Sequence, residues 1–230
     1  MLNFSDISKT NEIRKPLPAE AYKNINSAGE ISREEAVDFW KNEFSQSEES
    51  PVVDIYDRLL SEIFNVSEDD LHIDVDLDEH IKTLMDRFES SEWHTLSSDE
   101  KIDIMKSLID TVSEKLGLKN IPTLEVYEDE GTTFGDYNPV LNVISVNLKN
   151  CDNPIELIDT LMHELRHAYQ NERAELFETW QDALYRCNFD NYISPVPLPN
   201  GEWLFFLDYF NQYVEVDARA FASKFTEAMI

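Results

Sequence analysis

The residues best suited to chemistry form one pentapeptide, His163-Glu164-Leu165-Arg166-His167. It reads as H-E-x-x-H, a pattern in which two histidines bind a zinc ion and the glutamate acts as a general base. On a helix the histidines lie one turn apart on one side, so both imidazoles can reach one metal ion. The pentapeptide therefore predicts a zinc site with His163 and His167 as ligands and Glu164 as the base.

The residues around the pentapeptide predict the helix that it needs. Asn153 can cap a helix, Pro154 suits the first helical position and Glu156 follows in the first turn. Apolar residues at helical spacing fall on the side opposite the histidines, and they are Leu157, Ile158, Leu161, Met162, Leu165, Ala168 and Tyr169. One face can thus be buried while the other lines a cleft. The alternative is a chance pattern on a surface helix.

A catalytic zinc site usually has three protein ligands, so a third ligand is expected after His167. No histidine follows His167, and Ala168-Tyr169-Gln170 lacks the H-E-x-x-H-x-x-G-x-x-H continuation of metzincins. A carboxylate is therefore expected. The strongest candidates lie in one downstream segment, where Glu215 and Asp217 are both open as the third ligand.

Two motifs together resemble a known family. An H-E-x-x-H helix followed by a second helix with E-x-x-A-x-x-F-A, which begins at Glu215, resembles the small gluzincins, particularly ImmA/IrrE-type metallopeptidases of mobile elements and bacterial regulators. The segments 163–170 and 212–218 are also similar to stretches in phage-encoded proteins. The resemblance covers about residues 97 to 230. It implies a minimal zincin-like domain in which Glu215 is the third zinc ligand.

One position departs from the pattern of that family. Many gluzincins carry an acid four residues after the ligating glutamate, where it orients a zinc histidine, and this chain has Arg219 there. Asp217 is an alternative source of that hydrogen bond. The oxyanion that develops during hydrolysis also needs an electrophilic partner, and Tyr209, Tyr213 and Arg219 have suitable chemistry.

The strand expected just before the H-E-x-x-H helix consists of Val143, Ile144, Ser145 and Val146. In zinc peptidases a strand in this place commonly lies at the edge of a sheet, where a substrate backbone can add as a further strand. The four residues are therefore candidates for substrate binding. The alternative is an ordinary edge strand without that role.

The remaining patterns predict an α+β protein that is mainly helical, with a small antiparallel or mixed sheet beside the H-E-x-x-H helix. The expected parts are a flexible leader over residues 1–30, an acidic helical N-terminal module over 31–95 and the zincin-like domain over 96–230. Helices are expected to begin at Ser32, Val52, Asp78, Ser97 and Asn153, and a last helix is expected over residues 218–229. Strands are expected over residues 71–77, 121–127 and 143–146. Turns or loops are expected over residues 136–139 and 194–201.

The composition is that of a strongly acidic globular protein. Of the 230 residues, 42% are apolar, and the formal net charge is -28. Such a charge repels nucleic acid and anionic membranes and attracts a basic substrate or partner. Cys151 and Cys187 lack metal-binding spacing, so both are expected to be free thiols. Neither a secretory signal nor a membrane span is recognisable, so a cytoplasmic location is expected, with export without a cleaved signal as the alternative.

The sequence thus predicts a zinc-dependent endopeptidase that cuts a specific protein target, with Zn2+ as its cofactor. The partner is a protein or peptide substrate of basic character. The alternative is a catalytically idle sensor or adaptor with the same fold, or an acidic binding module for a basic partner. A third hypothesis is that residues 1–95 inhibit the enzyme. The patterns do not distinguish a regulator from a toxin or a phage factor.

Overall fold

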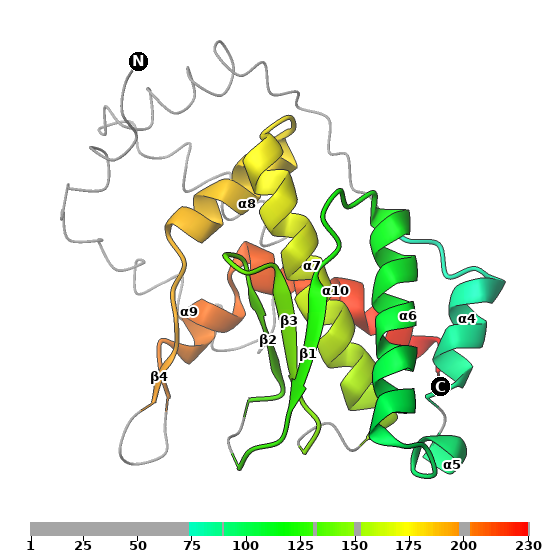
Figure 1. The fold of residues 1–230 in the computed structure, drawn as a ribbon. Helices are drawn as coiled ribbons and strands as arrows, with labels where there is room; N and C mark the ends of the chain where they lie inside the picture. The colour runs from blue at the N-terminus through cyan, green and yellow to red at the C-terminus, as the bar shows by residue number, and fades with distance from the viewer. Residues whose placement is uncertain (1–73, 89, 131–132, 150–152, 198–202, 230) are drawn as a thin grey trace, which may run out of the picture. The chain divides into compact units, whose positions relative to one another are not determined.

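The computed structural model describes residues 74–88, 90–130, 133–149, 153–197 and 203–229. The helices are α4 (Glu79–Asp86), α5 (Ser90–Trp93), α6 (Ser98–Leu116), α7 (Pro154–Leu176), α8 (Trp180–Asp190), α9 (Phe206–Phe210) and α10 (Tyr213–Glu227), and the strands are β1 (Thr123–Tyr127), β2 (Gly135–Asn138), β3 (Val143–Asn147), β4 (Val196–Pro197) and β5 (Trp203–Leu204). Helices predominate around a small sheet (Figure 1). This confirms the predicted mainly helical α+β class.

Helix α7 carries the H-E-x-x-H residues and begins as the sequence predicts. The Asn153 side chain accepts a hydrogen bond from the Ile155 backbone N–H, and Pro154 occupies the first turn, where a missing N–H costs nothing. Helix α6 likewise begins with the predicted capping box of Ser97 and Glu100. Local sequence alone therefore determines where both helices start.

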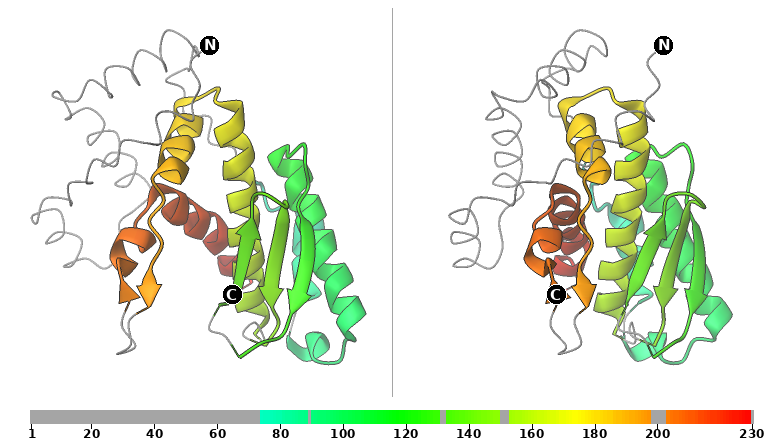
Figure 2. Two further views of the ribbon diagram at one scale, coloured as in Figure 1. Left: turned by 60° about the vertical axis from the view of Figure 1, so that its left-hand side comes forward. Right: turned by 90° about the vertical axis from the view of Figure 1, so that its left-hand side faces the viewer.

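Helix α7 lies between the three-stranded sheet and the helices α8 and α10 (Figure 2). One side packs against β2, β3 and α6, and the other against α8 and α10. All seven apolar residues predicted for the buried side are buried. The helix is thus held on two sides, which fixes the direction in which its histidines point.

The three-stranded sheet is mixed, with the order β1-β3-β2. β1 pairs with β3 in parallel, and β2 pairs with β3 antiparallel. β3 is therefore the central strand, and its backbone is paired on both sides. The expectation that Val143, Ile144, Ser145 and Val146 form an edge strand open to a substrate is wrong.

The edge strand that packs against α7 is β2, where the sequence predicts a turn. Residues 136–138 belong to this strand instead, because pairing with β3 satisfies their backbone groups. The turn follows it: the Asn138 side chain accepts hydrogen bonds from the N–H groups of Val140 and Leu141, and Asn142 has a positive φ of 52°. Asparagine tolerates both roles well, which explains the displaced turn.

The C-terminal part differs from expectation in two ways. Helix α8 was not predicted, although Thr179 and Asp182 form a capping box at its start. Within the expected loop over 194–201, β4 pairs with β5 in a short antiparallel ladder. The apolar residues Leu204, Phe205 and Phe206 at and after β5 are 44%, 50% and 44% exposed.

The N-terminal expectations are tested in part. The leader and the helices from Ser32 and Val52 lie outside the described residues, as does Cys151. Residues 74–77 are not a strand, and α4 packs against α6.

Cys187 is a free, partly buried thiol. Within the described part of the chain, no helix combines the length and apolar character that crossing a membrane requires.

Gly135 at the start of β2 lies close to α7. A Cβ atom there would lie 2.6 Å from Cγ2 of Thr160, 2.8 Å from the carbonyl oxygen of Ser145 and 3.6 Å from Cγ of Glu164. The first two distances are shorter than van der Waals contact. Glycine at this position therefore lets β2 lie directly against the helix.

We expect Gly135→Ala to destabilise the protein by roughly 1–3 kcal/mol, because the added methyl group forces β2 away from α7. Thr160→Ser removes one of the clashing atoms, so the double variant should recover part of the loss. Urea denaturation of the three variants and the wild type measures both effects. A Gly135→Ala variant as stable as the wild type would contradict this packing.

Candidate metal centre

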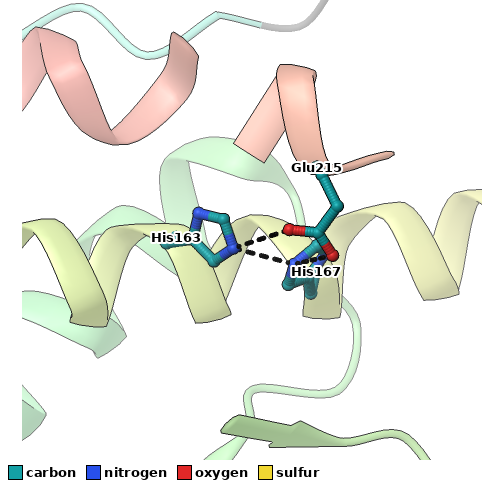
Figure 3. Close-up of side chains that lie close together, drawn as sticks. All are labelled: His163, His167 and Glu215. Carbon is teal, nitrogen blue, oxygen red and sulfur yellow. Dashed lines mark hydrogen bonds and ion pairs between the residues drawn. The ribbon is translucent and has the colours of Figure 1, made fainter. Parts of the chain in front are cut away.

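Three side chains from two helices converge at one point. α7 contributes His163 and His167, and α10 contributes Glu215 (Figure 3). The two Nε2 atoms are 3.1 Å apart, Oε2 of Glu215 is 3.3 Å from Nε2 of His163, and Oε1 is 3.5 Å from Nε2 of His167. The group could hold a metal ion.

The donor separations fit a small divalent cation. In a tetrahedral site with bonds of about 2.0–2.1 Å, neighbouring donor atoms lie about 3.3 Å apart, and the three distances here fall on both sides of that value. The Glu215 side chain is 1% exposed, whereas those of His163 and His167 are 17% and 12% exposed. The site is therefore anchored in the interior and reaches solvent at its histidines, where a water or substrate could enter.

Glu215 approaches the histidines and Asp217 does not, because the two acids lie on different faces of α10. Residues two positions apart on a helix are separated by about 200° around its axis, so the two carboxylates cannot point to the same place. Asp217 instead accepts hydrogen bonds from Nε of Arg166 at 2.7 Å and from Nη2 at 3.1 Å. The alternative that Asp217 is the third metal-binding residue is wrong.

Asp217 acts on His167 through an intermediate residue, Gln170. The Gln170 Nε2 group donates to the carbonyl oxygen of Val214 at 2.9 Å and to Oδ2 of Asp217 at 2.8 Å. Its Oε1 atom therefore faces Nδ1 of His167, at 2.8 Å. Because an amide oxygen only accepts, Nδ1 of His167 carries a proton and Nε2 presents its lone pair to a metal.

Glu164 is buried beside the three metal-binding candidates. Burial raises the pKa of Glu164 above its usual value, and the neighbouring acids Glu215 and Asp136 raise it further. His163 and His167 act in the opposite direction by favouring the charged carboxylate. A carboxyl group with a raised pKa is a suitable proton acceptor near neutral pH.

The three predicted electrophiles have different places. Tyr209 lies beside Glu215, and burial followed by that carboxylate raises the pKa of its phenol. Tyr213 is fully buried, with its ring stacked on Tyr185 and its hydroxyl accepting from Gln181. It lies on the face of α10 opposite Glu215, so its proposed contact with the oxyanion is wrong.

Arg219 lies one turn after Glu215 on α10, but its guanidinium group is engaged elsewhere. It donates to the carbonyl oxygen of Phe210, and its Cζ atom lies 3.6 Å from the centre of the Phe210 ring. Partial burial raises the pKa of the otherwise exposed Asp159 carboxyl group, and the charges of His163 and then Arg219 act in the opposite direction. Arg219 thus fastens α9 to α10, and its role towards an oxyanion stays a prediction.

Two residues at the site are not among those predicted from the sequence. The Tyr192 hydroxyl donates to Oε1 of Glu215 at 2.6 Å, and Gln170 contacts His167. The spacing of Gln170, three residues after His167 on one helix, is a signal that sequence inspection can use. Tyr192 lies 23 positions before Glu215, and no local pattern links the two.

A comparison of the chain with family models, with curated proteins and with solved structures found no match in any of the three. The resemblance to gluzincins rests on the sequence motifs and stays a prediction. The convergence of His163, His167 and Glu215, by contrast, is a feature of the structure itself.

We expect Gln170→Leu to weaken Co2+ binding about 10- to 100-fold, because Nδ1 of His167 loses the acceptor that orients the ring. Asn147→Leu is the matched control: Asn147 is also buried, but its amide group bonds to Asp129 and to the backbone of Lys149. Competition with a chromophoric chelator measures both affinities. Equal affinities of the two variants would contradict the role assigned to Gln170.

We also expect metal affinity to increase with pH. Burial alone would lower the pKa of His167, but Glu215 outweighs it and raises the pKa to about 9. Below that value the metal must displace a proton from His167, so the affinity should rise roughly tenfold per pH unit between about pH 7 and pH 9. Chelator competition across this range measures the slope. An affinity independent of pH there would show that His167 is already neutral.

Proposed function

We propose that the protein is a zinc-dependent peptidase. The observation that carries the proposal is the convergence of His163, His167 and Glu215 on one point beside the buried carboxyl group of Glu164. Two imidazoles and one carboxylate with an opening to solvent are a ligand set typical of catalytic zinc. Zinc bound there supplies a Lewis acid that polarises a carbonyl group and lowers the pKa of water.

In this proposal Glu164 moves the proton. Its carboxylate accepts a proton from the attacking water and then donates it to the amine that leaves, so each turnover restores the charged form. The raised pKa of Glu164 favours the first step, because it stabilises the protonated carboxyl group that forms when the water loses its proton. Gln170 and Asp217 hold the ring of His167, and Tyr192 holds the carboxylate of Glu215.

A peptide substrate is supported by the position of β2. This strand forms an edge of the sheet and lies against α7 close to Glu164. An extended peptide can add to such an edge through backbone hydrogen bonds, which are common to all sequences. We therefore transfer the proposed substrate-binding role from β3 to β2.

The net charge of -28 favours a basic substrate, in agreement with the acids near the site. Asp136 and Asp159 are both exposed and both interact electrostatically with residues of the H-E-x-x-H motif. Their negative potential attracts positively charged peptides and repels nucleic acid. A protein target with a basic, accessible segment is the substrate that we expect.

The variant Glu164→Gln tests the function. We expect it to retain about one zinc ion per chain and to lose peptide cleavage by roughly 10^2- to 10^4-fold, because the proton acceptor is absent. Glu175→Gln is the matched control: Glu175 is exposed on the same helix and is not one of the metal-binding residues. Elemental analysis measures zinc, and mass spectrometry of a digested-proteome peptide library measures cleavage.

The possible results separate the hypotheses. Zinc in all three proteins, with cleavage lost only in Glu164→Gln, supports the peptidase. Zinc in the wild type with no cleavage above that of Glu164→Gln favours the idle sensor or adaptor. Absence of zinc from the purified and zinc-incubated wild type contradicts the metal centre itself.

A further inference from the structure

Large apolar side chains are exposed on one segment beside the metal centre. They are Tyr192 (37% exposed), Val196 (45%), Leu204 (44%), Phe205 (50%) and Phe206 (44%), and together we call them the apolar surface. Single exposed apolar residues are ordinary, but a cluster close in sequence often marks a binding site.

The backbone arranges these side chains in a defined way. Val196 and Leu204 are directly paired across the β4–β5 ladder, so their side chains lie next to each other on one face. Phe205 has a positive φ of 61° and directly precedes α9. This conformation is unfavourable for a bulky residue, and such outliers concentrate at functional sites. The fold thus holds an aromatic residue in solvent in a strained conformation.

Aromatic contacts connect the apolar surface to the metal centre. The ring of Phe206 lies 6.4 Å from that of Tyr209, which lies 6.1 Å from that of Tyr192. The Tyr192 hydroxyl in turn donates to Glu215. A group resting on Leu204 and Phe206 is therefore only a few side chains away from the residues that bind the metal.

We propose that the apolar surface binds a large apolar side chain of the substrate, close to the peptide bond that is cleaved. This inference rests on the proposed peptidase function and narrows its substrate class. Tyr192 belongs to the apolar surface and also donates to Glu215, so the surface adjoins the metal centre, and we take its occupant to be the substrate. Together with the acids Asp136 and Asp159, the apolar surface indicates that the substrate is a basic peptide with an aromatic or large aliphatic residue.

Peptide hydroxamates test the inference, because the hydroxamate binds the metal and the side chains probe the surface. The probes are Gly-Gly-Gly hydroxamate and the three analogues in which Phe replaces one of the glycines. On the zinc-loaded full-length chain, we expect at least one Phe probe to bind about tenfold or more tightly than the Gly probe. Isothermal titration calorimetry measures each affinity.

Substitutions in the apolar surface show which residues cause the tighter binding of the Phe probe. We expect Leu204→Ala and Phe206→Ala each to remove most of the advantage of Phe and to leave binding of the Gly probe unchanged, which also shows that the variants fold. Leu141→Ala is the matched control, because Leu141 is 69% exposed in the turn after β2. This variant should retain the full advantage.

Three results overturn the inference. In the first, no Phe probe binds more tightly than the Gly probe. In the second, the tighter binding of the Phe probe persists in Leu204→Ala and in Phe206→Ala. Either result leaves the peptidase proposal intact if the Gly probe binds. In the third, the wild type forms a dimer in sedimentation experiments that either substitution dissolves, so a second copy covers the surface. If the Gly probe does not bind and the chain takes up no zinc, the peptidase proposal and this inference fail together.

Discussion

The buried ion pair of Arg166 and Asp217 is the interaction on which the geometry of the site depends. Both side chains are almost completely buried, and the guanidinium group contacts both carboxylate oxygens. A buried pair of this kind adds little net stability compared with apolar residues, but loss of one partner is costly, so it selects one arrangement. Arg166 precedes His167 by one residue and Asp217 follows Glu215 by two, so the pair aligns α7 with α10 where the three candidate metal-binding residues meet.

The hydrogen bonds around this pair extend its effect to the site. Asp217 also accepts from Gln170 and from the hydroxyl of Tyr185, so its oxygens are well satisfied despite burial. Gln170 passes the orientation on to His167. Low local polarity strengthens such a network and makes each missing partner expensive. The ion pair, the tautomer of His167 and the direction of its lone pair are therefore set together.

Helix α7 belongs to the core and also carries two of the three candidate metal-binding residues. Its apolar side is buried against the sheet and neighbouring helices, while His163 and His167 are partly exposed. The glycine at the start of β2 brings the sheet edge against this helix, and Tyr192 and α9 border Glu215 on another side. A buried interior thus supports the candidate metal-binding residues, and the exposed Tyr192 lies next to Glu215. Rigid support beneath an accessible site is what precise catalysis requires.

The sequence by itself determined the local features of this protein. The caps of α6 and α7, the buried side of α7 and the two histidines with Glu164 follow from spacing and side-chain chemistry within a few residues. Strand order, the choice of Glu215 over Asp217, and the contribution of Tyr192 were decided only by the tertiary structure. Strand order depends on pairing between segments far apart in the chain, and the other two depend on how α10 and the chain after α8 pack against α7. A pattern of neighbouring residues contains no information on which face of one helix meets which face of another.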